Sequence, residues 1–106
     1  MDNLQTYCFD IDGTICTTNC EYKDAKPFNQ VIKLINKLYS SGNKIILFTS
    51  RGSKSGKDWF EFTKNQINNW GIKYHKLIMG KPQADIFIDD RAINIDDWCK
   101  KNNILK

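Results

Sequence analysis

Tyr7-Cys8-Phe9-Asp10-Ile11-Asp12-Gly13-Thr14 is the stretch that decides the fold, because it is an apolar run that ends in two acidic residues. The apolar residues predict a buried β-strand. Side chains two positions apart on a strand point the same way, so Asp10 and Asp12 leave the strand end together. Two carboxylates this close repel each other, and a bound divalent cation, first of all Mg²⁺, offsets the repulsion. Gly13 permits a sharp turn and Thr14 adds a hydroxyl group. The stretch is typical of half of a metal-assisted phosphoryl-transfer site.

Two other interpretations of the acidic pair stay open on these residues alone. Asp and Gly are common in turns, so the stretch could be an ordinary strand-ending turn. It could also be a calcium loop. Such a loop would place a third oxygen ligand and then glycine at its sixth position, where this chain has Thr14 and Ile15.

Length and composition predict one domain over residues 1–106 with a single modest core. No apolar stretch reaches the length of a membrane span, and the N-terminus lacks a basic region followed by an apolar one. We therefore expect a cytoplasmic protein with no membrane partner. The net charge of +4 comes from scattered lysines, which indicates a solvated surface or, alternatively, an anionic partner.

The four cysteines are expected to be reduced thiols, because no export signal is visible. Cys16 and Cys20 share a loop, but a zinc site there would need two more ligands, and His75 and Cys99 are poor candidates.

The periodicity of apolar residues alternates between strand and helix along the chain. Strands are expected over Leu4–Ile11, Lys44–Thr49, Tyr74–Met79 and Asp85–Ile88, and helices from Pro27 to Gly42, over Asp58–Trp70 and from Asn94 onward. The tryptophans of the second helix, Trp59 and Trp70, are expected in the core. The pattern predicts an α/β domain with a mainly parallel central sheet flanked by helices.

Each predicted strand ends in polar residues that could carry chemistry. In chain order these are Asp10 with Asp12, then Thr49 with Ser50 and Arg51, then Lys81, then Asp89 with Asp90 and Arg91. Ligands bind at the carboxyl ends of parallel strands. The sequence therefore predicts that these residues converge on one site.

The chain resembles the haloacid dehalogenase superfamily, whose four motifs match in order over nearly its whole length. They correspond to Asp10-Ile11-Asp12-Gly13-Thr14, Thr49, Lys81 and Asp89-Asp90. More narrowly, Gly80-Lys81-Pro82 followed by Ile88-Asp89-Asp90-Arg91-Ala92-Ile93 is similar to small phosphatase-like proteins associated with capsular polysaccharide biosynthesis. The resemblance implies a single Rossmann-like domain without a cap.

The resemblance also implies the role of each site residue. Asp10 would attack phosphorus and form an aspartyl-phosphate, while Asp12 would serve as acid and then base. Thr49 and Lys81 would bind the phosphoryl group. Magnesium would be held by Asp10, the Asp12 carbonyl and one or both of Asp89 and Asp90. The remaining candidates for phosphate contact are Gly13, Thr14, Ser50 and Arg51, whereas the role of Arg91 stays open between phosphate contact and pairing with an acid.

An acid at Asp12 favours phosphatase over dehalogenase, because an alcohol leaving from phosphorus needs a proton and a halide does not. Neither interval between the motifs can hold a cap, so selectivity would come from the loop 15–26, with Tyr22 and Lys23, or from a second copy of the chain acting as a lid. We expect a sugar phosphate or related metabolite as the substrate. The alternatives are a phosphatase for nucleic-acid 3'-ends and a non-catalytic phosphate-binding or regulatory module.

Overall fold

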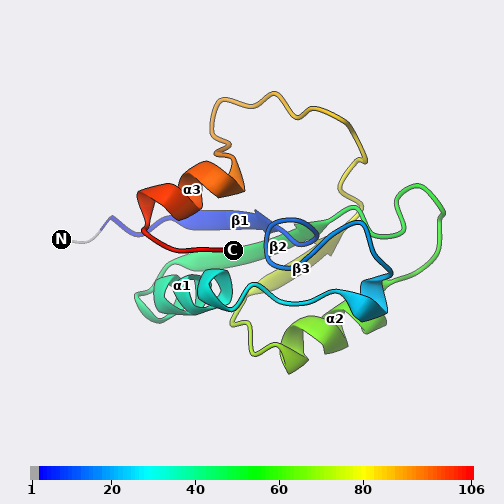
Figure 1. The fold of residues 1–106 in the computed structure, drawn as a ribbon, viewed down its shortest axis with the longest axis horizontal. Helices are drawn as coiled ribbons and strands as arrows, with labels where there is room; N and C mark the ends of the chain where they lie inside the picture. Colours follow the sequence, from blue (N-terminus) through cyan, green and yellow to red (C-terminus); the bar gives the residue numbers. More distant parts are fainter. Residues whose placement is uncertain (1–2) are drawn as a thin grey trace.

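The computed structural model describes residues 3–106 and forms a small α/β domain around a three-stranded parallel sheet (Figure 1). The strands are β1 (Thr6–Asp10), β2 (Lys44–Thr49) and β3 (Lys76–Met79), in the order β1-β2-β3. The register pairs Asp10 with Phe48 and Thr49 with Met79. The ends of the three strands therefore lie at one edge of the sheet.

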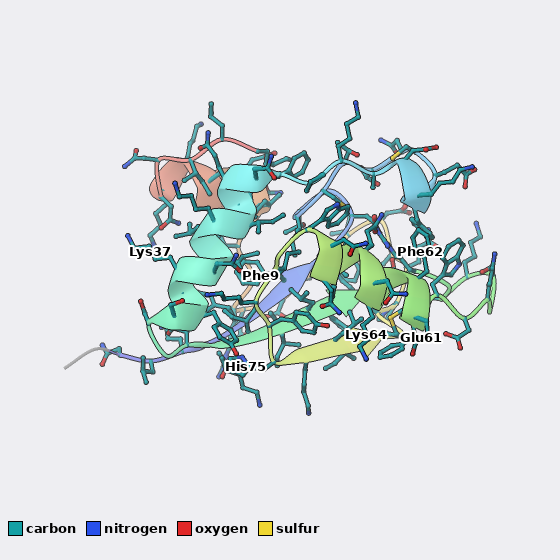
Figure 2. All side chains as sticks on the ribbon, turned by 90° about the horizontal axis from the view of Figure 1, so that it is seen from below. Phe9, Lys37, Glu61, Phe62, Lys64 and His75 are labelled. Atoms are coloured by element: carbon teal, nitrogen blue, oxygen red, sulfur yellow. The ribbon has the colours of Figure 1, made fainter. Side chains whose placement is uncertain are left out.

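The helices are α1 (Asn29–Ser40), α2 (Phe60–Asn69) and α3 (Ile95–Lys101), and a 3₁₀ turn, η1, spans Tyr22–Asp24. Helices α1 and α2 lie on the same side of the sheet, and α3 lies next to β1 (Figures 1 and 2). Phe9 of β1 meets Trp98 of α3 edge-on, with ring centroids 5.3 Å apart. No helix within residues 3–106 is both long and apolar enough to cross a membrane.

One face of the sheet carries most of the core. On β2 the side chains of Ile45 and Leu47 are fully buried, whereas the alternate residues Ile46 and Phe48 are only half-buried. Helix α1 contributes its apolar stripe, with Val31, Ile32 and Ile35 all buried. The continuous apolar run on the strand and the helical spacing on α1 are the two patterns that predicted these elements; the alternating burial along β2 shows that one face of the strand is buried more than the other.

The predicted strand Asp85–Ile88 does not form. These residues belong to an irregular segment between β3 and α3, in which Ile86 is 76% exposed, Phe87 52% and Ile88 96%. A strand needs a neighbour for its backbone hydrogen bonds, and in residues 3–106 the edge of β1 away from β2 has no strand beside it. The prediction of this strand was therefore wrong. The apolar composition indicates strand propensity, but these residues have no neighbouring strand to pair with.

The other expected elements are present: β2 has the predicted bounds, and the remaining elements are shorter. Helix α2 begins at Phe60 instead of Asp58, because the Asp58 carboxylate accepts a hydrogen bond from the Phe60 N–H at 3.0 Å and holds the preceding turn. Trp70 packs against the core as predicted, but Trp59 does not. All four cysteines are free thiols, with Cys16 and Cys99 buried and Cys8 and Cys20 exposed.

Candidate active site

Three of the four predicted strand ends converge. Asp10 closes β1, Thr49 closes β2, and Lys81 follows β3 by two residues. The Lys81 ammonium lies 3.5 Å from Oδ2 of Asp10, and the Lys81 N–H donates to the carbonyl of Thr49 at 3.0 Å. A nucleophile candidate, a hydroxyl and a cation therefore share this edge of the sheet.

The environment of Asp10 alters its acidity. Partial burial raises the pKa of the Asp10 carboxyl above its ordinary value, and the Lys81 ammonium acts in the opposite direction. Thr49 is almost fully buried, and its Oγ1 accepts a hydrogen bond from the Arg51 N–H at 3.1 Å. In this arrangement the Thr49 hydroxyl acts as a hydrogen-bond acceptor.

The turn after β1 is held by backbone hydrogen bonds. The Gly13 N–H donates to the carbonyl of Cys16, and the Ile15 N–H donates to the carbonyl of Ile11, both at 2.8 Å. Gly13 has a φ of +83°, which disfavours a side chain, while the space around it would admit a Cβ atom at ordinary contact distance. Glycine is thus required there for backbone conformation, not for room. Thr14 lies in the same turn, and Ser50 follows β2 directly.

Arg51 is bound to Asp12 through two hydrogen bonds. Its Nε donates to Oδ2 of Asp12 at 2.9 Å and its Nη2 to Oδ1 at 2.8 Å, and the arginine side chain is fully buried. Burial lowers the pKa of Arg51, but hydrogen bonds and charge from Asp12 outweigh it, so the net shift is upward. The guanidinium, predicted as a phosphate contact, here faces the Asp12 carboxylate.

Thr63 and Gln66, which the sequence did not identify as site residues, complete this network together with Tyr22 of the loop 15–26. Nη1 of Arg51 donates to Gln66 Oε1 at 2.8 Å and to Thr63 Oγ1 at 3.3 Å, and the guanidinium carbon lies 4.4 Å from the centre of the Tyr22 ring. Gln66 in turn donates to the carbonyl of Tyr22 at 2.6 Å. One feature of the sequence could have indicated this role of Gln66: it is a polar residue within the apolar stripe of the predicted helix.

Cys16 also contacts Asp12, with its Sγ 3.6 Å from Oδ1. Burial, together with the charge of Asp12, raises the pKa of Cys16 to about 12. The side chain is therefore a neutral thiol at physiological pH and acts as a hydrogen-bond donor to the carboxylate.

The fourth predicted strand end does not join the other three. Asp89 accepts a hydrogen bond from the Arg91 N–H at 2.8 Å, and the side chains of Arg91 and Asp90 lie 4.0 Å apart while 91% and 89% exposed. Arg91 thus contacts its acidic neighbours. Phe87 of the same segment places its ring 4.4 Å from the Lys81 ammonium.

The residues as arranged do not form a magnesium site. The part of the chain that the structure describes holds no group of three or more histidine, cysteine, aspartate or glutamate side chains suited to a metal ion. Asp10 and Asp12 supply carboxylate oxygens, but these face Lys81 and Arg51. A metal held jointly with Asp89 or Asp90 would require residues 85–91 to move.

Comparison with known proteins supports the fold. No family model matches the chain, and no curated protein matches it. Among solved structures, the chain is similar to the crystal structure of an MCSG target from Vibrio cholerae. The TM-score is 0.81 at 20% sequence identity, over 90% of this chain and 87% of that one. At this identity the similarity establishes a shared α/β architecture and nothing about activity.

Proposed function

We propose that the chain is a phosphomonoester hydrolase that works through an aspartyl-phosphate on Asp10, in a capless domain of the haloacid dehalogenase type. The observation that carries the proposal is the pairing of Asp10 with Lys81 at 3.5 Å, beside an Asp12 carboxylate that Arg51 fixes in place. A carboxylate nucleophile next to a cation and a second, separately held carboxylate suits phosphoryl transfer in two steps. The resemblance of the four motifs supports the same reaction.

In the first step an Asp10 oxygen attacks phosphorus, and the bond from phosphorus to the alcohol oxygen breaks. That oxygen takes its proton from Asp12. In the second step water attacks the phosphorus of the aspartyl-phosphate and gives a proton to Asp12. The bond between phosphorus and the Asp10 oxygen breaks, so phosphate leaves and the Asp10 carboxylate is restored. Lys81 offsets negative charge on the transferring group, and the Thr49 hydroxyl donates to one of its oxygens.

Both oxygens of Asp12 accept hydrogen bonds from Arg51. Proton donation therefore requires one oxygen to exchange its arginine bond for the leaving-group oxygen. Oδ2 is the better candidate, because Oδ1 also faces the Cys16 thiol. Magnesium dependence, a sugar phosphate or related metabolite as substrate, and a cytoplasmic location stay predictions.

The test is phosphate release by the purified chain, with and without Mg²⁺, from a panel of sugar phosphates and 3'-phosphorylated oligonucleotides. We expect turnover of at least one sugar phosphate, and its loss in Asp10→Asn. The hydrolase proposal is wrong if the wild type releases no phosphate from any of these. Phosphate binding without turnover would instead favour the non-catalytic phosphate-binding module.

A further inference from the structure

Three aromatic side chains form a row outside the hydrophobic core. Tyr22 meets Trp59 edge-on at 4.8 Å with an interplanar angle of 88°, and Trp59 meets Phe62 at 5.3 Å and 82°. Trp70 and Trp98 pack against the core, but the three rings of this row do not, and Phe62 is 36% exposed. Aromatic surface that stabilises no core is a candidate for ligand contact.

Arg51 connects this row to the candidate active site. Its guanidinium lies 4.4 Å from the Tyr22 ring and also holds the Asp12 carboxylate at 2.8 Å. In the proposed reaction Asp12 gives its proton to the leaving-group oxygen, so the leaving group lies on the Asp12 side of the phosphorus. The aromatic row is therefore on the side of the site where the alcohol part of the substrate has to be.

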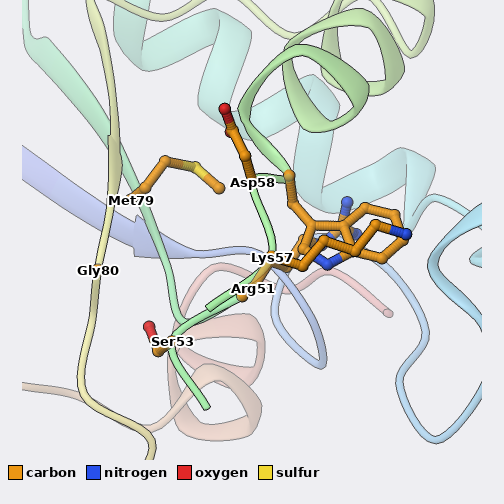
Figure 3. A pocket seen from close by; sticks show the side chains of 8 residues that line it. Arg51, Ser53, Lys57, Asp58, Met79 and Gly80 are labelled. Atoms are coloured by element: carbon orange, nitrogen blue, oxygen red, sulfur yellow. The ribbon is translucent and has the colours of Figure 1, made fainter. Parts of the chain in front are cut away.

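A hollow of about 150 Å³ opens beside Trp59, between residues 51–53, residues 57–59 and the end of β3 at residues 79–80 (Figure 3). We call it the Trp59 hollow. It adjoins Lys81, because the Ser53 hydroxyl donates to the Lys81 carbonyl at 2.8 Å. The hollow is thus next to a residue of the proposed phosphate site.

The loop that forms the hollow is tightly closed. Gly52 has a φ of +82°, and a Cβ atom there would lie 2.2 Å from the carbonyl oxygen of Lys57. Only glycine lets these two parts of the loop come so close. The close approach holds the Lys57 backbone in place, and the Lys57 ammonium lies 4.4 Å from the centre of the Trp59 ring.

We propose that the Trp59 hollow binds the leaving group of the substrate and that this group is a sugar ring; the inference rests on the proposed phosphomonoesterase function. A sugar ring has apolar C–H patches, which suit the Trp59 indole and the Met79 thioether. Its hydroxyls can accept a hydrogen bond from Lys57 and donate one to Asp58. Trp59, Lys57 and Asp58 are then specificity-determining residues.

The same geometry disfavours a nucleobase. Successive bases stack on parallel aromatic faces, but Tyr22 and Phe62 stand nearly perpendicular to Trp59. Within residues 3–106, both aromatic contacts of Trp59 are edge-on, and no ring stacks on it in parallel.

Binding can be tested separately from turnover in the Asp10→Asn variant. We expect glucose 6-phosphate, or another hexose phosphate in the panel, to shift the NMR resonance of the Trp59 indole N–H. Methyl phosphate and inorganic phosphate should bind without shifting it. If the hexose phosphates bind and leave the Trp59 signal unchanged, the subsite is wrong. Because this titration needs no catalysis, it decides the subsite even if the hydrolase proposal fails.

Kinetics of single variants give the second test. Removing one contact with the sugar should raise KM for the hexose phosphate by about tenfold, and should impair the turnover of methyl phosphate much less. We expect this from Lys57→Ala on the exposed loop and from Trp59→Ala, with a smaller rise for Trp59→Phe, which keeps an aromatic ring in the row. Lys64→Ala is the matched control, because Lys64 lies over the Phe60 ring at 6.0 Å on α2, outside the hollow.

Equal losses on methyl phosphate and hexose phosphate would show that these residues only support the fold and would overturn the subsite. Unchanged KM values in all variants would overturn it as well. If Trp59→Ala instead impairs only the hydrolysis of 3'-phosphorylated oligonucleotides, the hollow binds a nucleotide and the sugar proposal is wrong.

Discussion

The Arg51 guanidinium donates two hydrogen bonds to the Asp12 carboxylate, from Nε to Oδ2 at 2.9 Å and from Nη2 to Oδ1 at 2.8 Å. The two residues lie 39 positions apart in the chain. Because Gln66 and Thr63 hold the other end of the guanidinium, its orientation is fixed by helix α2. Arg51 acts in this arrangement as a positioning residue for the carboxylate that handles the proton.

Substituting Arg51 should impair the proton-transfer role of Asp12. A lysine cannot reproduce the two parallel donors of the guanidinium, so we expect Arg51→Lys to lower kcat about ten- to a hundredfold with little change in KM. Arg51→Ala should also destabilise the fold by about 3 kcal/mol, because it leaves a partly buried carboxylate without its partner. Steady-state kinetics and urea unfolding measure the two effects.

Gln66→Leu is the matched control for Arg51, since it removes one partner of the guanidinium and leaves the pair with Asp12 in place. We expect a much smaller loss of kcat than in Arg51→Lys. If Gln66→Leu and Arg51→Lys lose stability and activity in the same proportion, Arg51 supports only the fold.

The acid role of Asp12 predicts a dependence on the leaving group. Asp12→Asn should lower kcat for an alkyl phosphate about 10²- to 10⁴-fold, because the departing alkoxide needs a proton. The first step with an aryl phosphate should suffer less, since a phenolate leaves without one. Comparing the single-turnover rate of aspartyl-phosphate formation for the two esters is the measurement. Equal losses on both would show that Asp12 is not the acid.

The network around Arg51 could not be derived from the sequence, whereas the main elements could. Short continuous apolar runs identified β1 and β2 and helical spacing identified α1 and α2, because burial leaves a trace in the residues themselves. The pairing of Arg51 with Asp12 leaves no such trace. It depends on where helix α2 brings Thr63 and Gln66 against Arg51, which is a property of the packed domain.

Two differences between the predicted and the observed structure have the same physical origin. Trp59 shares the apolar stripe of α2 by its spacing, but the helix begins only at Phe60, so Trp59 has a φ of −107° and ψ of 10° and leaves the stripe. Ile86, Phe87 and Ile88 have the composition of a strand, yet strand formation needs a partner that composition does not specify. The spacing of side chains is local information, and both outcomes depend on neighbours distant in the chain.

Asp10 and Lys81 predict a particular pH dependence. Asp10 must be ionised to attack, and burial raises its pKa while Lys81 lowers it. The rate should therefore fall as the pH drops through the raised pKa of Asp10. In Lys81→Met the opposing ammonium is gone, so we expect this acid limb to move to higher pH, in addition to a loss of rate. The profile of kcat/KM against pH measures the shift, and a limb that stays in place would contradict the assignment of Asp10.

The same pKa shift predicts that Asp10 destabilises the fold at neutral pH. A carboxyl whose pKa is higher in the folded than in the unfolded state binds more protons when folded, so the free energy of unfolding falls as the pH rises from the unfolded pKa through the folded one. Asp10→Asn removes this cost. We expect the variant to be more stable than wild type at pH 7, with a smaller difference at acidic pH where both states are protonated. Urea unfolding at the two pH values is the measurement, and a variant less stable at pH 7 would contradict it.

Magnesium dependence carries a structural requirement that can be measured without turnover. Asp89 and Asp90 lie on the exposed segment away from Asp10, so a metal shared with either carboxylate has to bring residues 85–91 toward the strand ends. We expect Mg²⁺ to slow amide hydrogen exchange at Ile86, Phe87 and Ile88, which are now largely exposed, and to leave exchange in the loop around Lys54 unchanged. The double variant Asp89→Asn with Asp90→Asn should lose both the slowing and the activation by Mg²⁺. Full phosphatase activity in the presence of EDTA, with exchange at residues 86–88 indifferent to Mg²⁺, would show that the metal prediction is wrong while leaving the roles of Asp10 and Asp12 intact.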